Sequence, residues 1–134
     1  MGLRSMRQYV YVSTADELAP EDIADILEVC QRNNAVRAIT GMLIYNGRNF
    51  LQLIEGEADA LAALMERIGQ DSRHHGISVL YDEPADQRAC PDWLMKRIAL
   101  SESADTRRER LEADLPAALN PQLRQMILNF ALLN

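Results

Sequence analysis

The sequence predicts an α+β fold of the ferredoxin-like type, with a β-α-β-β-α-β core, a fifth strand and two C-terminal helices. Short runs of alternating β-branched and aromatic residues, typical of strands, are interleaved with two stretches of helical apolar spacing. An Asn-Gly pair between the second and third runs is a strong hairpin signal. The 134 residues, 48% apolar and 25% charged, fit an ordinary globular protein.

The first strand and the first helix have clear local signals. Residues 8–13 alternate, so that Tyr11 faces the opposite side of the strand from the two valines beside it. Pro20 suits the first turn of a helix, where its missing N–H is not needed, and apolar side chains at helical spacing continue to about Arg32. The polar stretch 33–37 is expected to lead out of this helix.

A β-hairpin and a second helix follow. Strands are expected over residues 39–45 and 49–54, joined by Asn46-Gly47, because both positions of such a turn favour positive φ. Glu55-Gly56 is expected to end the third strand, and the second helix then runs to about Ile68. The apolar residues of this helix share one face: Leu61, Leu64, Met65 and Ile68.

Two more strands complete the predicted sheet. They are expected over residues 77–81 and 93–100, separated by an acidic loop with two prolines, 82–92. A sheet of this type carries its two helices on one face and leaves the other face open. Residues 1–100 are therefore expected to form the domain, and residues 101–134 a helical extension that covers the open face or forms a dimer contact.

The extension contains signals for two helices. Ser101 or Ser103 can cap a short charged helix that runs to about Leu115. Asn120-Pro121 can start the last helix. Five apolar residues of that helix share the face that would cover the sheet or the partner: Leu123, Met126, Ile127, Phe130 and Leu133.

Charge and composition argue against several classes of partner. The net charge of −6 disfavours a nucleic-acid or anionic-membrane surface, because both attract clusters of Lys and Arg. No apolar run approaches the roughly 18–20 residues that span a bilayer. The two cysteines and the His74-His75 pair match no standard zinc spacing, so no metal site is expected. Reduced cysteines in a cytoplasmic protein are the better expectation.

Four residues stand where the pattern expects packing or strand ends: Tyr11, Asn34, Gln52 and Trp93. Gln52 alternates with two leucines and so projects to the other side, where a buried amide would need partners. Simpler explanations stay open at this point. Gln52 could lie on a wet face, Tyr11 could be an ordinary half-buried strand residue, and Asn33-Asn34 could cap the first helix. No nucleophile-plus-base motif and no P-loop is present.

Short motifs occur in a fixed order along the chain. They are residues 11–15 (YVSTA), 32–34 (RNN), 39–43 (ITGML), 50–56 (FLQLIEG), 67–68 (RI) with 71–74 (DSRH), and 93–95 (WLM). No single motif is specific, but the ordered set, from about Gln8 to Arg97, resembles the BLUF family, the blue-light sensors that use FAD. One departure is Ala38, which stands where members of this family usually have Gly.

The resemblance implies a flavin held noncovalently between the two core helices, FAD being expected, with FMN or riboflavin as alternatives. It implies that Tyr11 gives an electron and a proton to the excited flavin. Gln52 would bridge Tyr11 and the flavin N5/O4 edge, and the amide of Asn34 would hold the C4=O/N3 edge.

The resemblance also implies roles for residues around the ring. Ile26 and Ile68 would sandwich the ring from the two helices. Trp93 and Met95 would be the pair on the last strand whose exchange or shift carries the signal. The residues along the ribityl and phosphate side would be Asn33, Asp71, Arg73 and His74.

The expected function is a blue-light photoreceptor, which is a switch without substrate turnover. Residues after 100 leave room for two helices only, so the output would pass to an unidentified partner protein or through a change in a homo-oligomer. Two alternatives stay open. One is a flavin-binding or regulatory domain that does not respond to light. The other is an acyl phosphatase-like hydrolase using Asn34 with Arg37 or Arg73, although the acidic residues 13–17 contain no Gly to cradle a phosphate.

Overall fold

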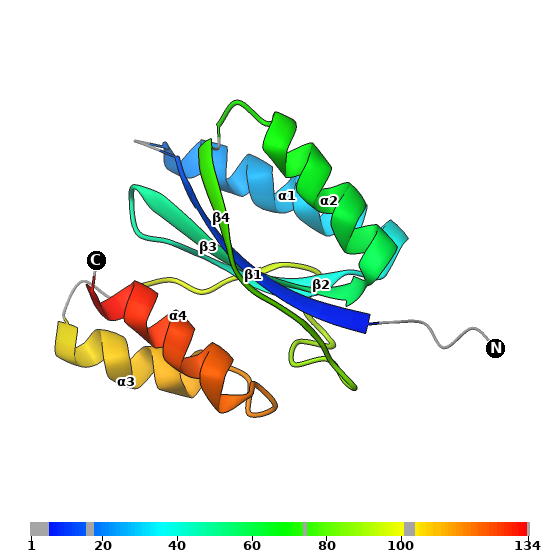
Figure 1. The fold of residues 1–134 in the computed structure, drawn as a ribbon. Coiled ribbons are helices and arrows are strands. Elements are labelled where there is room, and N and C mark those ends of the chain that lie inside the picture. The colour runs from blue at the N-terminus through cyan, green and yellow to red at the C-terminus, as the bar shows by residue number, and fades with distance from the viewer. Residues whose placement is uncertain (1–5, 16–17, 74, 101–103, 134) are drawn as a thin grey trace.

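The computed structural model describes residues 6–15, 18–73, 75–100 and 104–133, and it confirms the predicted α+β fold (Figure 1). The elements follow in the order β1 (Met6–Thr14), α1 (Pro20–Arg37), β2 (Thr40–Tyr45), β3 (Asn49–Glu57), α2 (Ala58–Gln70), β4 (His75–Pro84), β5 (Lys96–Arg97), α3 (Ala104–Asp114) and α4 (Pro121–Leu133).

The sheet has the strand order β4-β1-β3-β2-β5. Neighbouring strands from β4 to β2 in this order pair antiparallel, and β5 pairs parallel to β2 through only two residues. Figure 1 shows α1 and α2 on one face of the sheet and α3 and α4 on the other. The predicted ferredoxin-like core is therefore present, and the C-terminal helices cover the face that this core would leave open.

Each face of the sheet has its own apolar core, because side chains alternate along each strand. On the α1/α2 face, Phe50 and Ile54 of β3 pack with residues of both helices, among them Ile26 and Leu61. On the α3/α4 face, the buried strand residues are Val10, Met42, Ile44, Leu51 and Leu53.

The pairing of β1 with β3 places Tyr11 directly opposite Gln52. The predicted alternation holds on both strands, since Val10, Leu51 and Leu53 point into the α3/α4 core while Tyr11 and Gln52 point towards α1 and α2. Gln52 is only 3% exposed and Tyr11 is fully buried. The simpler explanations, a wet face for Gln52 and a half-buried strand position for Tyr11, are therefore wrong.

Helix α1 begins as predicted but ends later. Pro20 is its first residue, and the carboxylate of Asp22 accepts a hydrogen bond from the Ala19 N–H at 2.9 Å. The helix continues through the stretch 33–37, because the Asn34 side chain is buried against the core instead of capping the helix end. The left-handed position falls on Ala38 (φ 56°), so the alternative that Asn33-Asn34 caps the helix is wrong.

Strand β3 also runs further than expected. Glu55 and Gly56 pair with Gln8 and Arg7 of β1, so the ladder continues to Glu57 and α2 begins directly after it. The predicted fifth strand over 93–100 shrinks to Lys96–Arg97. The reason is that residues 93–95 make their hydrogen bonds to α1 and to the start of β2 instead of joining a full ladder.

Helix α4 starts where the sequence predicts. Asn120 Oδ1 accepts a hydrogen bond from the Leu123 N–H at 2.8 Å, which satisfies one of the free donors of the first turn. Leu123 and Ile127 are buried, and Met126 and Phe130 pack against the same core. The Leu133 side chain and the predicted caps Ser101 and Ser103 lie outside the described residues.

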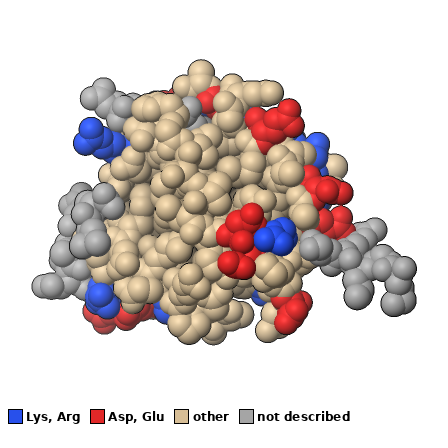
Figure 2. Space-filling model, in the orientation of Figure 1, with Lys and Arg blue, Asp and Glu red and all other residues tan. Residues whose placement is uncertain are grey.

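The surface in the orientation of Figure 1 is uncharged over much of its middle, and most of its acidic groups lie towards one side (Figure 2). Lys and Arg stand apart from one another on that face, among the residues described there. Within the same described part of the chain, none of the helices has the length and apolar character needed to cross a membrane.

Candidate functional site

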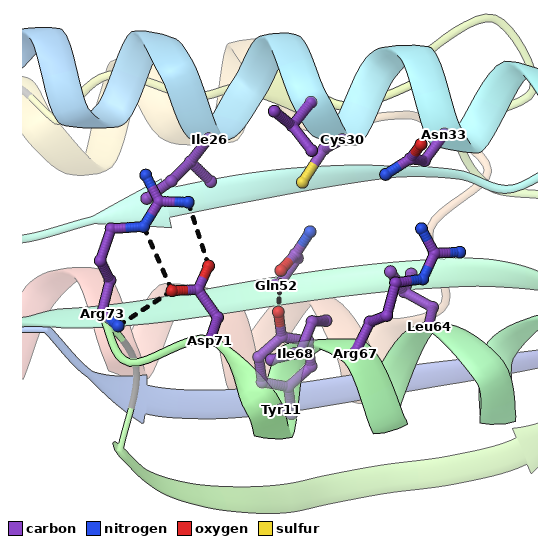
Figure 3. A pocket seen from close by; sticks show the side chains of 11 residues that line it. Tyr11, Ile26, Cys30, Asn33, Gln52, Leu64, Arg67, Ile68, Asp71 and Arg73 are labelled. Atoms are coloured by element: carbon purple, nitrogen blue, oxygen red, sulfur yellow. Dashed lines mark hydrogen bonds and ion pairs between the residues drawn. The ribbon is translucent and has the colours of Figure 1, made fainter.

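A cavity of about 170 Å³ lies between α1, α2 and the sheet (Figure 3). Helix α1 and the end of α2 supply its walls, and β1 and β3 supply its base. The lining residues are Tyr11, Ile26, Val29, Cys30, Asn33, Gln52, Leu64, Arg67, Ile68, Asp71 and Arg73.

Helical spacing explains why the wall residues point the same way. Ile26, Cys30 and Asn33 are separated by four and three positions on α1, and Leu64 and Ile68 by four on α2, so each set lies on one helix face. The facing Ile26 and Ile68 therefore give the cavity apolar walls on both sides. Four lining residues were not predicted as site residues, although this spacing could have identified them: Val29, Cys30, Leu64 and Arg67.

Tyr11 and Gln52 meet at the base of the cavity (Figure 3). The Tyr11 hydroxyl donates a hydrogen bond to Gln52 Oε1, as direct cross-strand neighbours on one face can. The Gln52 Nε2 in turn donates to the Met95 sulfur at 3.4 Å. Burial raises the pKa of the Tyr11 phenol well above its ordinary value, so Tyr11 is protonated at neutral pH.

Cys30 brings a thiol into the same cavity. Figure 3 shows its sulfur on the side of α1 that faces Gln52. Burial raises the pKa of this thiol, and an interaction with Gln52 opposes the rise. Cys30 and Cys90 are both free thiols.

Asp71 and Arg73 form a charged cluster at one end of the cavity. Arg73 Nη2 lies 3.0 Å from one carboxylate oxygen of Asp71, and Arg73 Nε lies 3.2 Å from the other. Arg73 Nη1 also reaches Asp25 on α1 at 3.1 Å. The cluster therefore ties the end of α2 to α1, and the hydrogen bond to Asp71 is the main reason that the pKa of Arg73 is raised. The predicted His74 lies outside the described residues.

Asn33 lines the cavity, whereas its neighbour Asn34 is not among the lining residues. The Asn34 Nδ2 donates to the Leu94 carbonyl at 2.5 Å. The Asn34 Oδ1 is buried, and none of the described residues donates a hydrogen bond to it. Leaving a buried acceptor unpaired is costly, so this atom is suited to accept a hydrogen bond from a bound group.

Trp93 and Met95 lie on opposite faces of the sheet. Met95 is 1% exposed in the α1/α2 core, next to Gln52. Trp93 is half-buried against the α3/α4 core, with the Lys96 ammonium 4.4 Å from its ring centroid. Of the predicted pair, only Met95 therefore contacts the base of the cavity.

Two other kinds of site can be compared with this geometry. In the described part of the chain, no three His, Cys, Asp or Glu side chains are grouped as metal ligands. The hydrolase alternative would use Asn34 with Arg37 or Arg73, and of these groups the Asn34 Nδ2 is engaged with a backbone carbonyl and Arg73 with two carboxylates.

Residues 6–96 match the family described as sensors of blue-light using FAD, BLUF. The chain is 32% identical over 96 residues to photoactivated adenylate cyclase subunit beta of Euglena longa, a match that covers 70% of this chain and 11% of that protein. It is also 32% identical over 73 residues to the blue light- and temperature-regulated antirepressor BluF of Escherichia coli (strain K12), covering 54% of this chain and 18% of that protein. The chain thus spans a small part of the length of these relatives.

Two solved structures of BLUF proteins are similar over nearly the whole chain. The dark-state structure of BlrB is 31% identical, with a TM-score of 0.71, and the match covers 95% of this chain and 87% of that one. The photo-activated state of BlsA is 28% identical, with a TM-score of 0.72 and 96% of both chains covered. Because the family match spans more than half of the sequence and the site has a buried Tyr-Gln hydrogen bond, the chain belongs to the BLUF family of blue-light sensors that use flavin.

Proposed function

We propose that this protein is a cytoplasmic blue-light photoreceptor that holds flavin in the cavity between α1 and α2 and responds through Tyr11 and Gln52. FAD is the proposed flavin, with FMN or riboflavin as alternatives. The observation that carries the proposal is the buried hydrogen bond from Tyr11 to Gln52 at the base of an apolar-walled cavity.

The residues around the cavity fit a flavin. Ile26 and Ile68 offer apolar surfaces to both faces of a flat ring. Asn34 lies beside the lining residue Asn33 and not on the cavity wall itself, so its Oδ1, which has no hydrogen-bond partner among the described residues, would accept from an N–H such as the one at ring position 3 only where the ring extends past Asn33. The residues proposed for the ribityl and phosphate side are Asn33, Asp71, Arg73 and His74.

The chemistry proposed for the chain uses one phenol and one amide. A bound flavin supplies the blue-light absorption and an excited ring that can take up an electron. Tyr11, which is protonated, can release an electron together with its proton, and Gln52 Oε1 is the acceptor in contact with that proton. The Gln52 amide has a donor and an acceptor on one rotatable group, so its reversal exchanges the hydrogen bonds without breaking a covalent bond.

The proposed output starts at the contact between Gln52 and Met95. Reversal of the amide would turn an oxygen towards the Met95 sulfur in place of the Nε2 donor, and so would weaken this contact. Met95 and Trp93 would shift in response, and the C-terminal helices of the 101–134 extension would pass the change from the 1–100 domain. The receiver is proposed to be a separate partner protein or a second copy of this chain, and no substrate is turned over.

The first prediction tests Tyr11 and Gln52. Purified protein should be yellow, and brief blue light should give a small, reversible red shift of its absorption. Tyr11→Phe removes the proton donor and Gln52→Leu removes the switching amide, so each variant should bind flavin and lose the red shift. Absorption spectra before and after illumination are the measurement.

Tyr9→Phe is the matched control, because Tyr9 lies on the same face of β1 but outside the cavity lining. It should keep the red shift. A normal light response in Tyr11→Phe or Gln52→Leu would contradict the proposed roles. A yellow wild-type protein without any red shift would instead indicate a flavin-binding domain that does not respond to light.

A further inference from the structure

Glu55 is a fully buried carboxylate on β3 that the proposed light response does not use. Its Oε1 accepts hydrogen bonds from the Thr40 hydroxyl at 2.9 Å and the Cys90 N–H at 2.6 Å. Its Oε2 accepts from the Gln8 amide at 3.1 Å and the Ala89 N–H at 2.9 Å. Each oxygen thus has one side-chain donor from the sheet and one backbone donor from the loop after β4.

These four bonds make the burial of a charge tolerable, since a buried carboxylate is costly unless its oxygens are paired. Arg88 adds bonds from the same loop to the sheet. Its guanidinium donates to the Glu55 carbonyl at 3.0 Å, to the Thr40 hydroxyl at 2.8 Å and to the Ala38 carbonyl at 2.7 Å. Residues 88–90 are therefore fixed to β2 and β3 at three consecutive positions.

The chain beyond this anchor passes from one face of the sheet to the other. Ala89 and Cys90 are buried in the α3/α4 core, and Met95 is buried in the α1/α2 core next to Gln52. Three consecutive carbonyls, of residues 93, 94 and 95, accept hydrogen bonds from the Gly41 N–H at 2.8 Å, Asn34 Nδ2 at 2.5 Å and Gln31 Nε2 at 2.9 Å. The crossing segment, residues 88–95, is thus held at both ends.

We propose that Glu55 is a positioning residue for the light response: by holding residues 88–90, it sets the place of the Met95 sulfur beside the Gln52 amide. This inference rests on the proposed function. Glu55 and Gln52 lie three positions apart on β3 and point to opposite faces, so Glu55 touches neither the cavity nor the Tyr11–Gln52 bond. Its proposed effect on Gln52 runs through the crossing segment.

The test is Glu55→Gln, which keeps the size of the side chain. Whichever way the new amide faces, its NH₂ replaces an oxygen that accepted from either the Ala89 or the Cys90 N–H, and two N–H donors cannot bond each other, so the hold on this pair of residues weakens. Flavin binding and the size of the red shift should stay as in wild type. Hydrogen exchange at the Ala89 or the Cys90 amide, whichever faces the new NH₂, should speed up by about tenfold or more, the usual effect of losing a bond to a charged group.

The kinetic readout is the thermal return of the red-shifted band. With one end of the crossing segment released, Met95 is less firmly held beside Gln52, and the return should be faster by about tenfold. Glu66→Gln is the matched control, because it makes the same charge change on the exposed side of α2. It should leave both exchange and return unchanged.

Arg88→Met is a second variant, in case Glu55→Gln does not fold. It removes the guanidinium bonds of the same loop but keeps the Glu55 carboxylate, so both effects should go in the same direction and be smaller. If folded Glu55→Gln or Arg88→Met protein shows wild-type hydrogen exchange at residues 89 and 90, or a wild-type rate of return from the red-shifted state, the role proposed for Glu55 is overturned. The proposed light response would still stand. A wild-type protein that binds flavin without a red shift would overturn the proposed function as well.

Discussion

At the scale of single residues, burial decides the state of the groups that face the cavity. Tyr11 and Cys30 both have their pKa raised, chiefly by burial, so the cavity contains a protonated phenol and a protonated thiol at neutral pH. Cys90 lies in the other core, where burial raises its pKa to about 12. The two thiols therefore both have a raised pKa, but they differ in their exposure to reagents in solution.

This difference gives a prediction for thiol modification. Cys30 is partly exposed whereas Cys90 is only 2% exposed, so an alkylating reagent should modify Cys30 first in flavin-free protein. Bound flavin should slow the modification in proportion to the fraction of protein that holds it. Intact-mass measurement over time, with Cys30→Ser as the control that loses the modification, is the test. Equal modification with and without flavin would contradict a flavin site beside Cys30.

The sequence could predict Tyr11 and Gln52 because strand alternation marked them as candidates and the family resemblance then selected them. It could not predict that Arg73 pairs with Asp25, since that contact depends on how α1 lies relative to the end of α2. Cys30 was within reach of helical spacing but lies on none of the motifs, and Arg67 lies on the 67–68 motif but was given no role in the site. Residues on a known motif are easier to find than residues that only share a helix face with it.

At the scale of elements, the sequence predicted which segments form helices and strands, but it did not predict where several of them end. Local patterns placed every helix and strand, but long-range hydrogen bonds decided where α1, β3 and β5 stop. Asn34 illustrates the cause, because its buried side chain favours a longer helix over the cap that its residue type suggests. The start of α4 was predictable because its cap is made by a neighbouring residue, Asn120.

The Asn120 cap gives a prediction about stability. Asn120→Ala removes the bond to the Leu123 N–H and a 3.2 Å bond to the Tyr81 hydroxyl, so the free energy of unfolding should fall by about 1–2 kcal/mol. Urea denaturation followed by circular dichroism measures this. Gln122→Ala, one exposed position inside the helix, is the control and should change the midpoint little. Equal midpoints for the two variants would show that the cap does not stabilise α4.

At the scale of the whole molecule, the sheet is covered on both faces. The α3/α4 core joins strand residues such as Leu51 and Leu53, both 0% exposed, to Leu123 and Ile127 of the last helix. The C-terminal helices therefore cover apolar surface that the first hundred residues alone would expose to water. The sequence predicted this cover from an apolar face on the last helix, although it left a dimer contact as the alternative.

The cover gives a prediction about truncation. Deleting residues 101–134 should expose the α3/α4 side of the sheet and make the protein aggregate or associate, because large apolar patches drive such contacts. Size-exclusion chromatography of the truncated and full-length chains is the measurement. A truncated protein as soluble as the full chain, with the same oligomeric state, would show that the extension is not needed as a cover.

The crossing of the sheet edge by residues 88–95 has a practical consequence for spectroscopy. Trp93 is the only tryptophan of the chain, and it lies on the face opposite the cavity. Indole fluorescence therefore reports on the environment of the C-terminal helices, while flavin absorbance would report on the cavity. One unlabelled sample can yield both signals, and the delay between them would time the passage of a structural change across the sheet.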